Sequence, residues 1–381
     1  MAMLHLKAGF FFCLILWLLW LGWLWLESRR HRKNLERITL RIHVNGTRGK
    51  SGVTRLVAAG LRAGGKRVCA KVTGTDAKFI APDGGERSLL RRGPANIREY
   101  LALAREAVDC GADTLVAECM ALRPELQNFC EHKLMRSHIG VITNVRHDHE
   151  EIMGPTLLDI AVSLGQTIPS SGGLVTTPAA FELLRAGCGL GADTVKIVQP
   201  ETVTQQEVAE LPFEVERENL ALALAVCELA GVDRVTALAG MRESRPDRGN
   251  LTVQDYRIEG HRIRVVNAMA ANDPDSTQIL WNRYAAEQGK VVGVVLHARP
   301  DRRLRTRQLG RFFAVFWPGP YYLTGDAAFA AKCLRQAGVA DRQIVVLPEP
   351  EQERVLWAVA ATMQEPDGIL FEAGNMKGFV A

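Results

Sequence analysis

The chain has 381 residues, of which 47 are Lys or Arg and 42 are Asp or Glu, so its formal net charge is +5. This length predicts two domains, and the 47% share of hydrophobic residues excludes a largely disordered chain. The small charge excess gives no indication of nucleic-acid binding and favours an anionic substrate or a phosphate ligand.

The first predicted element is an uncharged apolar helix at residues 8–26, which holds four of the seven tryptophans. A helix of this length just spans the hydrocarbon core of a bilayer. A cleaved signal peptide would carry its positive charges ahead of the apolar segment, whereas here five Lys and Arg residues follow it, within residues 29–37. We therefore expect a retained single-pass anchor whose basic flank keeps the bulk of the chain in the cytoplasm. The eight cysteines, which form no C-x-x-C pair, agree with a reducing compartment.

After residues 1–37, which we assign to the anchor and a basic linker, apolar strand patterns alternate with helical ones. The expected strands are at 38–44, 67–72, 114–117 and 139–143, and the expected helices are at 51–63, 97–108 and 218–229. This alternation indicates a mainly parallel sheet with helices on both faces. We expect residues 38–245 to form this α/β domain, with ligands bound beyond the carboxyl ends of its strands.

A polar segment with Pro and Gly at residues 243–250 predicts the domain boundary. A second strand–helix series follows, with expected strands at 263–266, 291–296, 321–324, 344–347 and 369–371. We therefore expect residues 246–381 to form a smaller, Rossmann-like α/β domain.

A phosphate-binding loop is predicted between the first strand and the first helix of the larger domain. Its members are Gly46, Thr47, Arg48, Gly49, Lys50 and Ser51. Small residues let backbone N–H groups approach phosphate oxygens, a Lys ammonium neutralises the phosphates, and a Ser hydroxyl can bind Mg²⁺. The eight-residue P-loop has a further Gly where this chain has Val44, so the match is to a shorter variant. The alternative is a Gly-rich turn that only caps a helix.

Acidic and histidine side chains follow the next two strands. Glu118 ends a buried apolar run and is a natural Mg²⁺ ligand, although acids at strand ends are also common on solvated rims. Two His and three acidic residues lie within residues 147–151. They are either a second metal site or a solvated polar loop, and the absence of a nearby Cys argues against a clustered zinc site.

Three segments resemble the Mur-ligase superfamily of ATP-dependent amide ligases: GTRGKS at 46–51, AECMA at 117–121 and TNVRHDHEEIMGPTL at 143–157. They are more similar still to the ligase subunits of bacterial poly-γ-glutamate synthases, which make capsules. Segments at 267–276, 299–306, 323–325 and 374–375 support this branch, so that the resemblance covers essentially the whole chain in order. It implies a Mur-ligase-like P-loop domain, a smaller C-terminal domain and a transmembrane helix ahead of both.

The resemblance also implies roles for individual residues of the first domain. Lys50 would neutralise the transferring phosphate, and Ser51 and Glu118 would hold the Mg²⁺ of ATP. His149 would bind a second Mg²⁺. Many members of the superfamily carry a carbamylated lysine in the helix that follows, but residues 161–165 contain no lysine, so the second metal site would be completed differently here.

Four further residues correspond to nucleotide-contacting positions of the superfamily. Asn219 would contact adenine, Arg248 would contact the γ-phosphate from the hinge, and Asn272 and Asp273 would close onto the nucleotide from the second domain. The polyglutamate branch is expected to have Pro where this chain has Arg248, which puts the hinge role of this arginine in question.

The implied chemistry is attack of a carboxylate on the γ-phosphate of ATP, which gives an acyl phosphate that an amine converts to an amide. Catalysis of such transfers rests on positioning and electrostatics. Donor and acceptor of a growing polyglutamate are both acidic, so Arg299, Arg302, Arg303 and Arg305 form a candidate binding stripe. The alternative for these arginines is a solvated basic face.

The function we expect is an ATP- and Mg²⁺-dependent ligase that polymerises glutamate through γ-glutamyl bonds at the inner (cytoplasmic) membrane. The resemblance implies glutamate, growing poly-γ-glutamate and small integral-membrane export subunits as partners, it allows a homo-oligomer, and it involves no nucleic acid. One alternative is another Mur-like ligase, such as a folate polyglutamate ligase, against which the anchor counts. A UDP-sugar ligase is disfavoured, because no substrate-binding domain fits between anchor and P-loop.

Two alternatives belong to other classes. A membrane-anchored P-loop ATPase that energises polymer transport would hydrolyse ATP without forming an amide. A capsule-assembly tyrosine kinase would carry a tyrosine-rich tail, whereas only five tyrosines occur in this chain.

Overall fold

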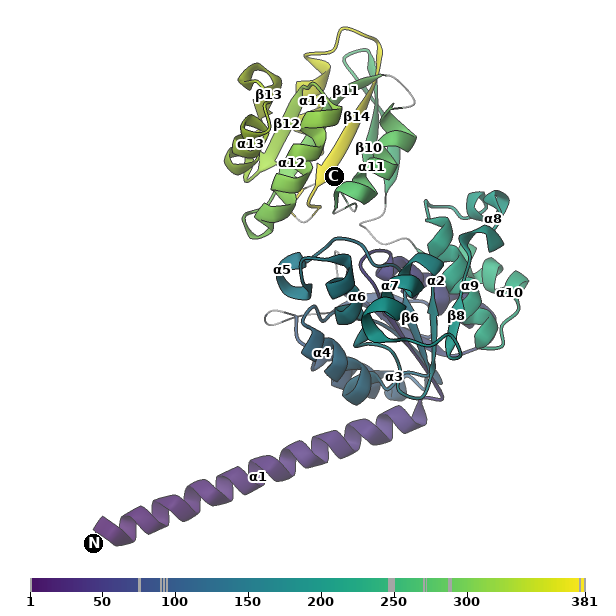
Figure 1. Ribbon diagram of the computed structural model, residues 1–381, viewed down its shortest axis with the longest axis vertical. Coiled ribbons are helices and arrows are strands. Elements are labelled where there is room, and N and C mark those ends of the chain that lie inside the picture. Colours follow the sequence, from purple (N-terminus) through teal and green to yellow (C-terminus); the bar gives the residue numbers. More distant parts are fainter. Residues whose placement is uncertain are drawn as a thin grey trace. The chain divides into compact units, whose positions relative to one another are not determined.

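The computed structural model describes residues 2–74, 77–89, 91, 93, 95–245, 251–269, 271, 273–286, 290–376 and 378–379. The chain divides into two compact units, Met1–Arg245 and Pro246–Ala381 (Figure 1). Each unit holds its own sheet with helices on both faces, as the alternation of strand and helix patterns predicted.

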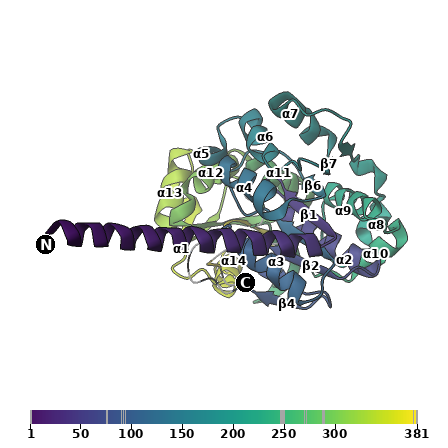
Figure 2. The ribbon, with the colours of Figure 1, turned by 90° about the horizontal axis from the view of Figure 1, so that it is seen from below.

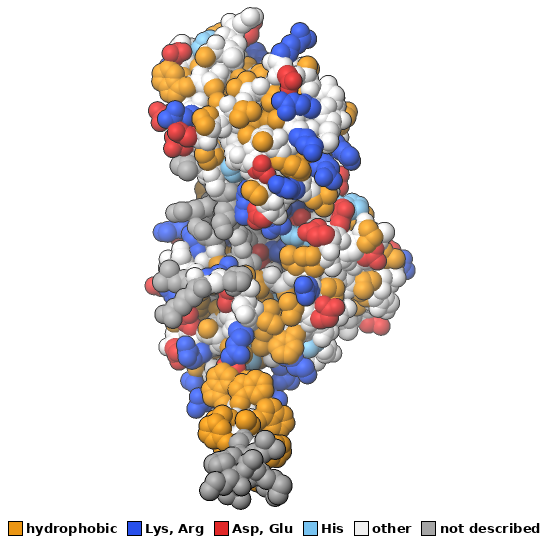
Figure 3. All heavy atoms as spheres, turned by 90° about the vertical axis from the view of Figure 1, so that its left-hand side faces the viewer, with side chains coloured by type: hydrophobic (Ala, Val, Ile, Leu, Met, Phe, Trp, Pro, Cys, Tyr) orange, Lys and Arg blue, Asp and Glu red, His pale blue; other side chains and the backbone are white. Residues whose placement is uncertain are grey.

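The first element, α1 (Ala2–Arg37), is one long helix (Figures 1 and 2). The apolar side chains from Phe10 to Leu26 are largely exposed, and Figure 3 shows them gathered along this helix. Within the described residues, α1 is the one helix long and apolar enough to cross a membrane. No other described part of the chain buries this apolar window.

The last turns of α1 differ from the linker that the charged sequence suggested. His31, Leu35 and Ile38 are spaced i, i+4 and i+7, and all three are buried against the first unit. The Nε2 atom of His31 lies 2.9 Å from the carbonyl oxygen of Leu134, and Arg98 pairs with Glu27 at 2.6 Å. The end of the apolar helix is therefore an integral part of the first unit.

In a chain shortened to residues 27–381, the Leu35→Ala substitution should lower the free energy of unfolding of the first unit by about 2–4 kcal/mol, because a fully buried leucine leaves a cavity. Outside α1 the tryptophans are Trp281, Trp317 and Trp357, all in the second unit. In the shortened chain, a change in circular dichroism with no change in tryptophan fluorescence therefore reports unfolding of the first unit. The exposed Lys33→Ala control should stay within about 0.5 kcal/mol of the parent chain. Equal free energies of unfolding for Leu35→Ala and Lys33→Ala would show that the last turns of α1 connect to the first unit without stabilising it.

The sheet of the first unit is mainly parallel, in the order β4-β3-β2-β5-β1-β6-β7-β8. The strands are β1 (Leu40–Asn45), β2 (Val68–Val72), β3 (Lys78–Ile80), β4 (Glu86–Ser88), β5 (Thr114–Glu118), β6 (Ile139–Ile142), β7 (Gly173–Thr176) and β8 (Val195–Ile197). Only β3 and β4 run antiparallel to their neighbours. Since β1 lies between β5 and β6, the carboxyl ends of these three strands meet at one edge.

Helices cover both faces of this sheet. They are α2 (Lys50–Ala63), α3 (Glu99–Asp109), α4 (Pro124–Phe129), α5 (Glu150–Met153), α6 (Leu157–Gly165), α7 (Pro178–Cys188), α8 (Gln205–Ala209), α9 (Arg217–Leu229) and α10 (Arg234–Arg242). One core packs α2, α9 and α10 against one face, and another packs α3, the end of α1 and the π-helical turn Cys130–Met135 against the other. Residues 53–61 of α2 are thus buried between the sheet and the helices α9 and α10.

The second unit has a six-stranded sheet in the order β13-β12-β11-β14-β10-β9. Its strands are β9 (Thr252–Ile258), β10 (His261–Asn267), β11 (Val291–Ala298), β12 (Tyr321–Gly325), β13 (Ile344–Val346) and β14 (Asp367–Gly374). All neighbours are parallel except β9 and β10. Helices α11 (Pro274–Trp281), α12 (Arg303–Phe316) and α13 (Ala327–Gln336) pack on one face, and α14 (Gln352–Ala360) packs on the other.

One buried carboxyl group stands out in this second unit. Glu372 on β14 is fully buried, and neither of its carboxylate oxygens has a hydrogen-bond partner among the residues that the structure describes. Burial raises the pKa of Glu372 to about 8. The folded protein therefore keeps the Glu372 proton between about pH 4.5 and 8, whereas the unfolded chain loses it, so stability falls as the pH rises through this window.

The Glu372→Gln variant should remove this dependence. Relative to the variant, the parent chain should lose about 1.4 kcal/mol of stability per pH unit between about pH 4.5 and 8. Urea unfolding followed by tryptophan fluorescence at pH 5.5 and 7.5 measures the difference for the second unit. A stability difference that is the same at both pH values would contradict a proton held by Glu372.

Candidate functional site

The predicted phosphate-binding residues lie at the carboxyl edge of the first sheet. Residues 46–51 connect β1 to α2, Glu118 is the last residue of β5, and residues 143–149 follow β6. Val44 of β1 is paired with Glu118 and with Val141, so the ends of the three strands are level. The structure therefore brings Lys50, Ser51 and Glu118 to one place, with His149 on the loop after the third strand.

The two glycines of the loop occupy positions that other residues cannot easily take. Gly46 and Gly49 have φ values of 129° and 79°. A Cβ atom on Gly46 would lie 2.8 Å from the backbone nitrogen of Thr143, and one on Gly49 would lie 2.5 Å from Oδ1 of Asn219. Helix α2 begins directly after Gly49, so its first free N–H groups line the loop. This backbone shape is a cradle suited to phosphate oxygens.

Lys50 folds back over the loop. Its ammonium donates hydrogen bonds to the carbonyl oxygens of Gly46, at 2.7 Å, and Thr47, at 3.2 Å. An ammonium has three donors, so one remains for an anion held in the cradle. The side chain thus both braces the loop and brings positive charge to it.

Ser51 and Glu118 form a pair of oxygen donors beside the cradle. The hydroxyl of Ser51 donates to Oε2 of Glu118 at 2.8 Å, and the backbone N–H of Thr73, after β2, donates to the same oxygen at 2.6 Å. Mg²⁺ prefers such hard oxygen ligands, takes few of them from the protein, and completes its shell with phosphate oxygens and water. The pair therefore fits the Mg²⁺ of a nucleotide bound in the cradle.

The segment after β6 clamps the loop from its other side, which the sequence did not reveal. The carbonyl oxygen of Asn144 accepts hydrogen bonds from both the N–H and the hydroxyl of Thr47, each at 3.1 Å. Its side-chain Oδ1 accepts from the N–H of Arg48 at 3.0 Å. Thr143 in turn donates to the carbonyl oxygen of Arg48 at 2.5 Å. An Asn directly after a buried strand was the available signal.

His149 lies at the same edge, in the left-handed conformation with φ 51°. Its ring nitrogens are 3.7 Å from Asp148 and 3.5 Å from Glu151, and Asp148 also pairs with Arg48 at 3.2 Å. Among the residues that the structure describes, no three His, Cys, Asp or Glu side chains form a group able to hold a metal ion. A second cation at His149 stays a prediction, and it would take most of its ligands from bound substrates.

Asn219 and Glu218 begin the buried part of α9 beside the loop. The Oδ1 atom of Asn219 is buried and has no hydrogen-bond partner within the described part of the chain. An unmet buried acceptor costs about 1–3 kcal/mol, so a ligand that donates to it would recover this energy. Burial raises the pKa of Glu218, which pairs with Arg146 at 2.8 Å. The sequence singled out Asn219 but neither Glu218 nor Arg146.

In the second unit, the segments that carry the resemblance also meet at a carboxyl edge. Asp273 is the N-cap of α11 and accepts from the N–H of Ser276 at 2.8 Å. Arg305, after β11, donates to Oδ1 of Asn375, after β14, at 2.8 Å. Nδ1 of His297 lies 2.8 Å from the hydroxyl oxygen of Thr324. Arg248 and Asn272 lie outside the described residues, so their predicted nucleotide contacts stay predictions.

The arginines of the candidate stripe lie between β11 and the first turns of α12. Arg299 pairs with Asp301 at 2.7 Å, and Arg303 lies 3.8 Å from Asp326. Arg302 is half-buried, as is Arg305. Three arginines at or before the start of a helix concentrate positive charge at its N-terminus, where an anion is favoured.

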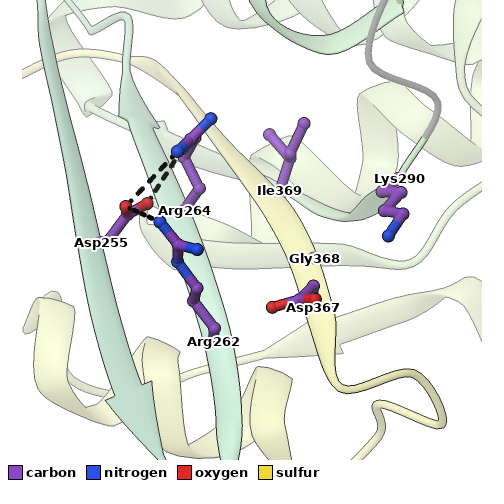
Figure 4. A pocket seen from close by; sticks show the side chains of 7 residues that line it. All are labelled: Asp255, Arg262, Arg264, Lys290, Asp367, Gly368 and Ile369. Atoms are coloured by element: carbon purple, nitrogen blue, oxygen red, sulfur yellow. Dashed lines mark hydrogen bonds and ion pairs between the residues drawn. The ribbon is translucent and has the colours of Figure 1, made fainter.

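A shallow pocket of about 150 Å³ lies at the opposite, amino-terminal edge of this sheet (Figure 4). Arg262 and Arg264 on β10 both point to Asp255 on β9, at 2.6 and 2.9 Å. These hydrogen bonds lower the pKa of Asp255 to about 2. Because the arginines already share a carboxylate and lie away from the carboxyl ends of the parallel strands, we do not assign the active site here.

Comparisons of sequence identify the family. Residues 253–381 match the family described as the poly-gamma-glutamate synthase CapB C-terminal domain. The PGA synthase CapB of Bacillus subtilis (strain 168) is 36% identical over 293 residues, which are 74% of this chain and 73% of that protein. The capsule biosynthesis protein CapB of Bacillus anthracis is 34% identical over 291 residues, which are 75% of this chain and 62% of that protein.

Solved structures share the fold. A folylpolyglutamate synthase of Mycobacterium tuberculosis, complexed with ADP and AMPPCP, matches with a TM-score of 0.62 at 16% identity and covers 89% of each chain. A bifunctional folylpolyglutamate synthase/dihydrofolate synthase of Yersinia pestis, complexed with AMPPNP and a Mn ion, also has a TM-score of 0.62 at 16% identity, and covers 92% of this chain and 90% of its own. The chain therefore belongs to the CapB family of poly-γ-glutamate synthases and shares the two-unit α/β fold of the folylpolyglutamate synthases.

Proposed function

We propose that this protein is an ATP- and Mg²⁺-dependent ligase that polymerises glutamate through γ-glutamyl bonds, by way of an acyl phosphate. The observation that carries the proposal is the Ser51–Glu118 oxygen pair, 2.8 Å apart, beside a glycine cradle that three strands hold in place. The family match supports the polymer, and the nucleotide complexes of the structural relatives support ATP as the phosphate donor.

In the first half-reaction, a substrate carboxylate oxygen attacks the γ-phosphorus of ATP, and ADP leaves. The N–H groups of residues 46–51 and the ammonium of Lys50 bind the phosphates and stabilise the charge that spreads over them. Ser51 and Glu118 would hold Mg²⁺, which would supply further neutralisation of the phosphate oxygens. Asn219, with its unmet buried acceptor, offers a place for a donor such as the amino group of adenine.

In the second half-reaction, an amine attacks the acyl carbon, an amide bond forms, and inorganic phosphate leaves with the amine proton passing to solvent. Both substrates are anionic, so the enzyme must bring like charges together. Arg299, Arg302, Arg303 and Arg305 supply positive charge at the carboxyl edge of the second sheet. The contact of Arg305 with Asn375 keeps one of these guanidinium groups in place.

We further propose that α1 anchors the enzyme in the inner membrane with both units in the cytoplasm. The unburied apolar span of α1 and the basic residues after it support this placement. Leu35 near the end of α1 packs in a core of the first unit, so the anchor leads directly into this unit. Small integral-membrane subunits that export the polymer are the expected partners.

Membranes that contain the protein and its neighbouring subunits, incubated with ATP, Mg²⁺ and labelled glutamate, test the proposal. We expect a labelled polymer that resists α-peptidases and is absent in the Lys50→Ala variant. Lys50-dependent release of ADP without any glutamyl product would instead support a transport ATPase. Addition of glutamate to a folate acceptor would support a folate polyglutamate ligase.

A further inference from the structure

A chain of hydrogen bonds runs through the interior of the first unit to the main chain of Glu118. Its members come from three elements: His43 on β1, Tyr100 on α3 and Glu131 in the π-helical turn Cys130–Met135. Nδ1 of His43 lies 2.9 Å from Oε2 of Glu131, and Nε2 of His43 lies 2.9 Å from the hydroxyl of Tyr100. That hydroxyl donates to the carbonyl oxygen of Glu118 at 3.0 Å. All four residues are buried.

The donor and the acceptor of each hydrogen bond follow from the groups at the two ends of this chain of bonds. A carbonyl oxygen only accepts, so the phenol proton of Tyr100 points to Glu118, and the phenol oxygen must accept from Nε2–H of His43. At the other end, the Glu131 carboxylate already accepts from the N–H and the hydroxyl of Ser137, at 2.8 and 2.9 Å, and so it accepts from Nδ1–H of His43. Both ring nitrogens of His43 therefore donate, as only an imidazolium can.

The charges of the pair agree with this assignment. Burial opposes the charged form of His43, but its hydrogen bonds with Cys119 and Glu131 outweigh burial and raise its pKa to about 9. Burial likewise opposes the charge on Glu131, whose pKa is nevertheless lowered by His43 and Ser137. The ammonium of Lys71 also faces the cluster, 5.0 Å from the centre of the Tyr100 ring.

A buried ion pair of this kind is not an efficient source of stability, because apolar side chains of the same volume do as well or better. What the ion pair provides is a fixed orientation of the side chains that it joins. Tyr100 holds the main chain of Glu118 from inside the unit, while Thr73 and Ser51 hold the Glu118 carboxylate from the loop side. The residue that faces the phosphate cradle is thus fixed at both its backbone and its side chain.

We propose that His43, Tyr100 and Glu131 are positioning residues that aim the Glu118 carboxylate at the metal of the bound nucleotide. The inference rests on the proposed function in one respect, which is that Glu118 and Ser51 hold that metal. All three side chains are buried and act on Glu118 only through its main chain, so their loss should weaken the binding of metal–nucleotide and leave the binding of metal-free nucleotide unchanged.

The Tyr100→Phe variant tests this, because it removes one hydroxyl and keeps the ring that packs in the core. The dissociation constant of AMPPNP is measured by calorimetry on the full-length protein in detergent, once with Mg²⁺ and once with EDTA. We expect the Mg²⁺ form to bind about 5- to 10-fold more weakly to the variant, the size of one buried hydrogen bond, with no change in EDTA. The Glu131→Gln variant should shift the same ratio in the same direction.

Tyr321→Phe is the matched control, because the buried hydroxyl of Tyr321 also donates to a backbone carbonyl, that of Phe313, at 3.0 Å. It should leave both constants unchanged. The ratio of the two constants does not depend on the folded fraction, so a partly unfolded variant still gives an answer. The proposal would be overturned if the ratio of the dissociation constant in Mg²⁺ to that in EDTA were the same as in the wild type for both Tyr100→Phe and Glu131→Gln. Wild-type protein that binds AMPPNP equally with and without Mg²⁺ would instead overturn the metal assignment of Ser51 and Glu118.

Discussion

Replacement of Lys50 by alanine should lower ATP-dependent glutamyl ligation by at least about 10²- to 10³-fold, the usual loss when one preorganised donor to a developing charge is removed. Lys50 is the first residue of α2, and its ammonium donates two hydrogen bonds within the cradle and has a third donor for phosphate. The ammonium acts mainly when negative charge spreads in the transition state, so kcat should fall more than the affinity for ATP. Initial rates of ADP release in the presence of glutamate measure the effect.

The matched control for this substitution is Lys196→Ala. Lys196 is an exposed lysine of β8, in the same unit, and it pairs only at 3.4 Å with Glu228. This variant should keep wild-type rates within about twofold, because surface ion pairs of this kind contribute little. Rates in Lys50→Ala that equal those of the control would exclude residues 46–51 as the phosphate-binding loop.

Replacement of Glu118 by glutamine should lower the rate of ligation by a similar factor, and it should also raise the Mg²⁺ concentration that the enzyme requires. The amide keeps the shape of the side chain and can still accept from Ser51, but it removes the negative charge that attracts a divalent cation. We expect the Mg²⁺ concentration for half-maximal activity to rise about 10-fold or more, and kcat to fall about 10²-fold even at saturating Mg²⁺. A series of Mg²⁺ titrations at fixed ATP separates the two effects.

Glu125→Gln provides the corresponding control, because Glu125 is an exposed acid in the first turn of α4. It should leave the Mg²⁺ titration unchanged. If Glu118→Gln lowers activity without moving the Mg²⁺ midpoint, then Glu118 does not hold the metal, and its role is only to anchor Ser51 and Thr73.

The parallel strands were predictable from the sequence because each is a short apolar run between helical patterns. The segments 114–117 and 321–324 correspond to β5 and β12 within one residue. Five strands were not predicted, namely β3, β4, β7, β8 and β9, although the edge strand β13 was. Among the missed edge strands, β4 is short and mostly exposed, and β9 is largely exposed along its length. Their apolar signal is weak because little of an edge strand is buried.

Part of the candidate site could also be predicted, because its residues follow the ends of these apolar strands. Motif spacing placed Lys50, Ser51 and Glu118 at strand ends, and parallel topology then brought them together. The clamp by Asn144 and the bond between Glu131 and His43 join residues that are 97 and 88 positions apart in the sequence, and backbone or buried side-chain atoms make those bonds. Contacts of this kind carry no local sequence pattern, so only the folded chain reveals them.

The most direct test of the ligase chemistry uses glutamate labelled with ¹⁸O in its γ-carboxylate. Membranes with the protein and its partner subunits are given ATP and Mg²⁺, and the inorganic phosphate released is analysed by mass spectrometry. Ligation through an acyl phosphate predicts one ¹⁸O atom in the phosphate for each amide bond formed, because the attacking carboxylate oxygen leaves with the phosphate. Phosphate that carries oxygen from water alone, at the same rate of ATP consumption, would contradict ligation and identify a hydrolytic ATPase.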